Sequence, residues 1–175
     1  MRTLIVYSSL TGNTRQVAEA IAGALPGPVD LYPVHKAPAP LGYTLVLPGF
    51  WVNRAMADPR MLRYFPQIIG QQVAFFGTLA AWPDSPHALK VIENTKEALK
   101  NNTLLGAFLC QGRLSPKRMA QYNDPARARP NHPMTPERMA RLEEAQNHPD
   151  ANDLANAAQY FLAIYNTLAQ KRKIP

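Results

Sequence analysis

The sequence predicts an α/β fold in which a five-stranded parallel sheet carries helices on both faces. Strand-like and helix-like segments alternate along the chain, which is the pattern of doubly wound sheets. At 175 residues the chain is long enough to bury one good core and too short for two ordinary domains. We therefore expect residues 1–175 to form one domain.

Each element is predicted from its hydrophobic spacing. A β-rich run at 3–7 is followed by a helix at 14–25, in which Val17, Ile21 and Leu25 share one face. The strand at 44–47 is expected to end at Pro48 and Gly49, because both residues favour turns. The other strands are expected at 29–34, 72–76 and 103–110, and the other helices at 59–69, 85–100, 135–146 and 152–171.

An irregular, Pro/Arg-rich excursion is expected at about 111–150, between the fifth strand and the last helix. Its density of proline favours a fixed irregular segment or a mobile loop over a second domain. One short helix is expected inside it, with Thr135 as N-cap and Pro136 at the first helical position.

Composition excludes several classes of protein. The single cysteine, Cys110, rules out an internal disulfide and a thiolate metal cluster within one chain, and we expect it to be a buried apolar residue. No stretch reaches the roughly 20 apolar residues of a membrane span, so we expect a cytoplasmic protein. The four histidines show no metal-ligand spacing, and the basic residues belong to no recognisable nucleic-acid module. We assign no catalytic residue and no metal ligand.

A turn with hydroxyl side chains follows the first predicted strand. It contains Ser9, Leu10, Thr11, Gly12, Asn13 and Thr14, and the first helix begins directly after it. Unpaired backbone N–H groups at a helix start, together with nearby hydroxyls, can hold a phosphate monoester. The lysine of the nucleoside triphosphate loop and the dinucleotide pattern GxGxxG are both absent. The alternative is an ordinary Ser/Thr-capped helix after a turn.

Three runs carry a family resemblance. The run IVYSSLTGNT at 5–14 resembles the FMN-phosphate loop of flavodoxins, while GTLAAWPD at 77–84 and HPDANDL at 148–154 resemble a less-studied branch of flavodoxin-domain proteins. The resemblance implies a strand order of 2-1-3-4-5 and FMN as the cofactor. It also implies that the loops after strands one, three and four meet at one edge of the sheet.

The resemblance further implies a clamp around the flavin ring. Trp51 and Trp82 could stack on its two faces, and the backbone of Thr78, Leu79, Ala80 and Ala81 could bond its pyrimidine edge. Phe50 is the rival for the role of Trp51, which could instead be a packing residue, and Pro83 could turn Trp82 away. Many flavodoxins have glycine after the first aromatic residue. Here Val52 and Asn53 follow, and Asn53 could supply a different donor.

Three functions remain open at this point. The first is an electron carrier between a reductase and an acceptor protein, and the second is an NAD(P)H-dependent quinone or FMN oxidoreductase of the same fold. The third is an accessory module with weak or no flavin. The net charge of +7, with Arg54, Arg113, Lys117, Arg118, Arg127 and Arg129 near the expected site, favours an acidic redox partner or the phosphates of a nicotinamide cofactor. Scattered solvated arginines are the alternative.

Overall fold

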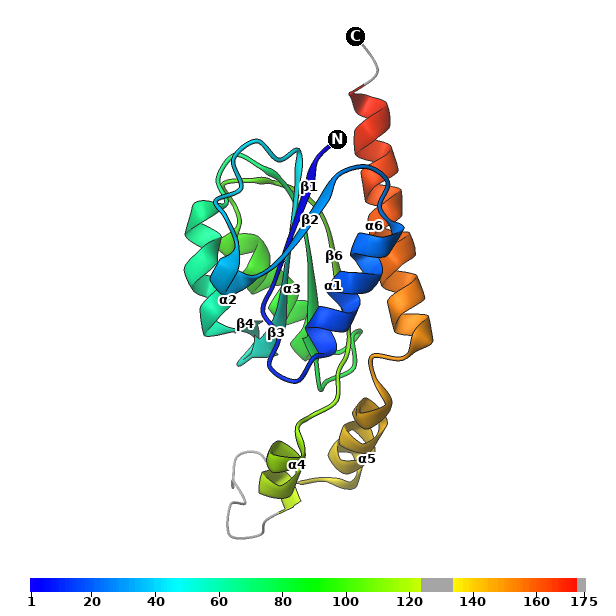
Figure 1. Cartoon of the computed structure of the whole chain (residues 1–175). Coiled ribbons are helices and arrows are strands. Elements are labelled where there is room, and N and C mark those ends of the chain that lie inside the picture. The colour runs from blue at the N-terminus through cyan, green and yellow to red at the C-terminus, as the bar shows by residue number, and fades with distance from the viewer. Residues whose placement is uncertain (124–133, 173–175) are drawn as a thin grey trace.

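A parallel sheet forms the centre of the molecule (Figure 1). The computed structural model describes residues 1–123 and 134–172. The strands lie in the order β2-β1-β3-β5-β6, and β4 pairs antiparallel with the end of β3. Apart from this short extra strand, the predicted order is confirmed. The strands are β1 (Thr3–Tyr7), β2 (Val29–Pro33), β3 (Leu45–Asn53), β4 (Met56–Ala57), β5 (Gln72–Leu79) and β6 (Thr103–Gln111).

Helices cover both faces of the sheet, as predicted (Figure 1). One core cluster joins the sheet to α1 (Asn13–Ala24) and α6 (Ala151–Lys171). The other joins it to α2 (Pro59–Tyr64) and α3 (Pro86–Ala98). Two 3₁₀ turns complete these layers, η1 (Val34–Lys36) after β2 and η2 (Phe65–Gln67) after α2. In the part of the chain that the structure describes, no helix is long and apolar enough to cross a membrane.

Strand β3 does not stop at Pro48 and Gly49, so this predicted boundary was wrong. Val46 lies opposite Val73 of β5 and Gly49 lies opposite Phe76. Between them is Pro48, which has no N–H to donate. Gly49 is a site of close approach rather than a turn, because a Cβ there would lie 2.0 Å from the Phe76 ring. The strand therefore continues through both residues to Asn53.

The excursion leaves the sheet after β6 and returns before α6, below the carboxyl ends of the strands (Figure 1). We call its described residues, 114–123 and 134–147, the arm. The arm contains α4 (Pro116–Asn123), α5 (Pro136–Glu144) and the 3₁₀ turn η4 (Ala145–Asn147). Helix α5 begins after Thr135 as predicted, because the Thr135 hydroxyl accepts the backbone N–H of Arg138. Arg127 and Arg129 lie outside the described residues.

Helix α4 was not predicted, although its start carries a recognisable signal. The hydroxyl of Ser115 accepts the backbone N–H of Arg118, and Pro116 follows at the first helical position. Two ends of the arm meet at its base, where the Arg113 N–H donates to the His148 carbonyl at 2.8 Å.

Candidate functional site

The start of α1 is an uncapped helix end at the carboxyl edge of the sheet. Gly12 occupies the N-cap with a φ of 93°, in the left-handed region that favours glycine, and no side chain caps the helix. The Ser8 N–H donates to the Gly49 carbonyl at 2.8 Å, which holds the start of the loop against β3. The first N–H groups of α1 and the positive end of its dipole are thus available to an anion.

Two polar atoms of this loop are buried without a hydrogen-bond partner among the described residues. They are Ser9 Oγ and Asn13 Oδ1. A buried polar atom left in this state costs about 1–3 kcal/mol, so a native orphan calls for a bound group or water. Thr11 is half-buried and Leu10 is exposed, whereas Asn13 and Thr14 are buried, so only the first part of the predicted loop is accessible.

Side chains of α1 tie this loop to β5 and β6. Thr14 Oγ1 and Thr78 Oγ1 lie 2.8 Å apart in a buried hydrogen bond. Asn13 Nδ2 donates to the Arg113 carbonyl at 2.8 Å, and a Cβ on Gly112 would approach that nitrogen to 2.7 Å. The segments predicted to meet therefore do meet. The Thr14 hydroxyl is bonded to Thr78, so its direct contact with a ligand stays a prediction.

Phe50 is not available to stack on a ligand, and this part of the prediction was wrong. Its side chain is fully buried on the face that α2 and α3 cover. Its ring centroid lies 6.0 Å from that of Phe75 and 6.3 Å from that of Phe65. The residue belongs to the core because β3 runs past Gly49 instead of ending there.

Trp51 and the residues after it lie in strand β3, whereas the sequence analysis expected an exposed loop here. All three of Trp51, Val52 and Asn53 are half-buried. Trp51 is the register partner of Thr78, which is in turn the partner of Cys110. Aligned residues of parallel strands share a face, so Trp51 lies on the same face as α1. This places a half-buried aromatic residue beside β5, the strand that anchors the loop at residues 9–14.

A two-residue turn joins β3 to β4. Its residues, Arg54 and Ala55, have φ values of 52° and 59°, which is the left-handed geometry of a tight hairpin. Asn94 of α3 donates its side-chain N–H to the Ala55 carbonyl at 2.9 Å. The turn that follows Trp51 is therefore fixed to a neighbouring helix.

The segment after Phe76 begins as strand and ends as a loop. Thr78 and Leu79 complete β5 and are buried, Ala80 is half-buried and Ala81 is buried. Trp82 Nε1 donates to Glu144 Oε2 of α5 at 2.7 Å, and the Arg141 guanidinium lies 5.9 Å from the centroid of the indole ring. Trp82 thus contacts the arm, and its stacking on a flavin stays a prediction.

Asp58 is a residue of this site that the sequence analysis missed. The residue is 1% exposed, and its Oδ1 accepts hydrogen bonds from Ser8 Oγ at 2.8 Å and from the Arg60 N–H at 3.0 Å. Its Oδ2 is buried without a partner among the described residues. The pair Asp58-Pro59 before a short helix is an N-cap signal, but it gave no sign of the contact with Ser8.

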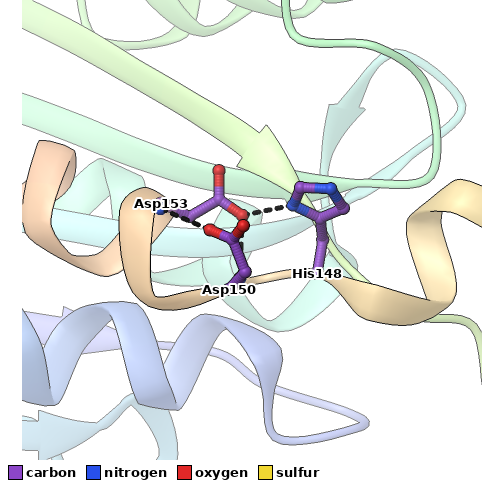
Figure 2. A group of neighbouring side chains, drawn as sticks. All are labelled: His148, Asp150 and Asp153. Atoms are coloured by element: carbon purple, nitrogen blue, oxygen red, sulfur yellow. Dashed lines mark hydrogen bonds and ion pairs between the residues drawn. The ribbon is translucent and has the colours of Figure 1, made fainter.

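Three potential metal ligands gather where the arm returns to α6 (Figure 2). Ligand atoms of His148, Asp150 and Asp153 lie within 4.8 Å of one another. Asp153 Oδ2 accepts the Asp150 N–H at 2.9 Å and contacts His148 Nδ1 at 2.5 Å, while Asp150 Oδ1 accepts the Asp153 N–H. The hydrogen bond to Asp153 raises the pKa of His148. These contacts form a capping box for α6, which accounts for the group without an ion.

Cys110 is a buried residue of the core, as predicted. Burial raises the pKa of its thiol well above the ordinary value, and the nearby carboxylates of Asp153 and Asp150 add to this shift. A thiol in this state is a poor nucleophile at neutral pH.

Comparison with known proteins finds a matching domain profile and two similar sequences. The sequence profile of the flavodoxin domain matches residues 4–162. The flavodoxin-like domain-containing protein BilS of Clostridioides difficile is 28% identical, with 91% of this chain and 94% of that protein covered. BilS of Clostridium symbiosum is 29% identical over 93% of this chain and 94% of that protein.

Solved structures share the fold at lower identity. Flavodoxin 2 of Bacillus cereus has a TM-score of 0.62 and 16% identity, with 95% of this chain and 99% of that one covered. A flavoprotein of Lactobacillus acidophilus in complex with FMN has a TM-score of 0.53 and 16% identity, over 62% of this chain and 92% of that one. Because the profile matches most of its length and the sheet has the corresponding topology, this chain belongs to the flavodoxin domain family.

Proposed function

We propose that this protein binds FMN and carries electrons between protein partners. The observation that supports the proposal most strongly is the uncapped start of α1, with the partnerless Ser9 hydroxyl beside it. A helix end of this kind fits a phosphate monoester, which is the terminal group of FMN. The membership of the chain in the flavodoxin domain family and a neighbour solved with FMN point to the same cofactor.

The residues present offer both kinds of hydrogen-bonding group that FMN needs. The N–H groups at the start of α1 and the hydroxyls of Ser9 and Thr11 are donors for the phosphate. Asn13 Oδ1 and Asp58 Oδ2 are buried acceptors that find no partner within residues 1–123 and 134–172, and the hydroxyl groups of the ribityl chain are donors that would satisfy them. The polar groups at this edge of the sheet thus fit a phosphate attached to a polyol.

The ring would lie between the ends of β3 and β5. Trp51 offers an aromatic plane there, and the backbone of Ala80 and Ala81, beyond the paired end of β5, offers donors and acceptors for the pyrimidine edge. When bound, FMN supplies the redox chemistry, and the protein supplies its position and its surroundings.

Titration of the apo protein with FMN and with riboflavin tests the phosphate site. We expect FMN to bind at least about tenfold more tightly than riboflavin, which lacks the phosphate, because charge-assisted hydrogen bonds contribute about 1.5–3 kcal/mol each. Ser9→Ala should weaken FMN binding and leave riboflavin binding nearly unchanged. Thr167→Ala, which removes an exposed hydroxyl of α6, is the matched control. Equal affinity for the two flavins would contradict the proposed phosphate site.

Carrier and enzyme can be separated with the FMN-loaded protein. A carrier should oxidise NADH and NADPH slowly by itself and rapidly once a flavin reductase is added. Rapid consumption of either nucleotide by the purified protein alone would assign it instead to the oxidoreductases of this fold.

A further inference from the structure

An open cleft of about 550 Å³ lies between η1 and α2. Its floor includes Tyr64, which is 3% exposed and whose hydroxyl donates to the Pro38 carbonyl at 2.6 Å. The polar side chains of its rim are exposed. The residues that line the cleft are Val34, His35, Arg60, Arg63, Tyr64 and Gln67.

The charge around this cleft is positive and uncompensated. Between Asp30 and Asp84 the chain has the basic residues Lys36, Arg54, Arg60 and Arg63 and a single acidic one, Asp58. Asp58 is buried, and its Oδ1 accepts the backbone N–H of Arg60 rather than its guanidinium. Within residues 1–123 and 134–172, neither Arg60 nor Arg63 forms an ion pair.

Asp58 connects the helix that lines the cleft to the start of the loop at residues 9–14. This residue is the N-cap of α2, which carries both arginines, and it bonds to Ser8 at the end of β1. A partner seated in the cleft would therefore contact the helix whose N-cap bonds to the end of β1. Short distance to the cofactor is what a docking site for electron transfer requires.

We propose that this cleft is the docking site for an acidic surface of the redox partner, an inference that rests on the proposed function. Carboxylates on the partner would pair with Arg60 and Arg63. The lining argues for a protein surface over a small anion. Its two arginines are exposed side chains of α2, and among the described residues no lining side chain holds a buried partnerless polar atom of the kind found at Ser9 and Asn13.

The test titrates an oligoglutamate peptide into the isotope-labelled protein, both apo and FMN-loaded, and monitors binding by NMR. We expect shift changes in residues 34–36 and 60–67 that weaken as salt rises. The double variant Arg60→Gln/Arg63→Gln should bind the peptide about tenfold more weakly, because it loses two ionic contacts. The control Lys96→Gln/Lys171→Gln removes the same charge from exposed sites on α3 and α6 and should bind like the wild type.

A charge-reversed variant keeps the test independent of simple loss of fold. Arg60→Glu/Arg63→Glu should lose the oligoglutamate peptide and gain binding of an oligolysine peptide in the same residues. Equal weakening in the control pair, or shift changes confined to other surfaces, would overturn the proposal. Saturable binding of inorganic pyrophosphate in the cleft, tighter than that of the peptide, would also overturn it and assign a small-anion site. Because the peptide is tested on the apo protein too, a failure to bind FMN would be seen separately as a failure of the proposed function.

Discussion

Substituting Phe50 and Trp51 one at a time should distinguish a residue that stabilises the core from a residue that contacts the proposed cofactor. The Phe50 ring is fully buried and contacts the rings of Phe65 and Phe75 at 6.3 and 6.0 Å between centroids. Aromatic pairs contribute about 0.5–1.5 kcal/mol each beyond their buried area, so Phe50→Leu should lower the free energy of unfolding by about 1–3 kcal/mol. Any cavity that the smaller side chain leaves adds to this loss. For a chain of this size, the midpoint temperature falls by about 2–4 °C per kcal/mol.

Trp51→Leu should show the opposite balance of effects. Trp51 is half-buried at the carboxyl end of β3, so we expect a smaller loss of stability but a clear loss of FMN affinity. A tryptophan stacked on the flavin quenches its fluorescence, so flavin bound to Trp51→Leu should be brighter than flavin bound to the wild type. Urea unfolding of the apo proteins measures the first effect, and fluorescence titration measures the second.

Two results would refute this reasoning. If Phe50→Leu unfolds at the same urea concentration as the wild type, the burial of Phe50 has been misjudged. If Trp51→Leu changes neither the affinity for FMN nor the brightness of the bound flavin, Trp51 does not contact the ring. The wild-type apo protein is the reference for unfolding, and Trp82→Leu tests whether the second tryptophan shares the effect.

Three further predictions follow from single residues. Asp153 raises the pKa of His148. The stabilisation from this pair is therefore fully present below the unfolded pKa of about 6.5 and is lost as pH rises through the folded pKa. The difference in unfolding free energy between the wild type and His148→Asn, measured in urea, should shrink as pH rises. Gly112→Ala should weaken FMN binding in a titration, because its Cβ would lie 2.7 Å from Asn13 Nδ2, whereas Gly23→Ala meets nothing within 4 Å and should leave binding unchanged. Cys110 should react with a thiol reagent at neutral pH only once urea unfolds the protein, and fast labelling of the native chain would contradict its burial and raised pKa.

Local patterns in the sequence predicted most of the sheet and helices, because the hydrophobic spacing and the helix-start residues agree with the final fold. The start of α5 after Thr135 and the run of α6 from Ala151 to Lys171 are examples. The end of β3 could not be predicted in this way. Pro48 and Gly49 favour a turn by their local preferences, and it is the packing of Phe76 over Gly49 that explains the glycine in a strand.

The candidate site also combines features that local sequence patterns predict with contacts that they do not. The turn from Ser9 to Thr14 could be found from its residues, since a glycine and hydroxyls at a helix start have a local meaning. The bonds of Ser8 to Asp58 and of Thr14 to Thr78 join residues 50 and 64 positions apart, and no local pattern reports them. Phe50 and Trp51 were hard to separate because adjacent residues of a strand face opposite sides, and the choice depends on where the strand ends.

The base of the arm has a consequence for how this fold can vary. The chain leaves β6 and comes back to α6 at nearly the same point, where the N–H of Arg113 meets the carbonyl of His148. Segments with adjoining ends can be exchanged for others of different length while the rest of the protein keeps its register. Nature or an engineer could therefore graft a new attachment here, beside the carboxyl edge of the sheet, without redesigning the sheet.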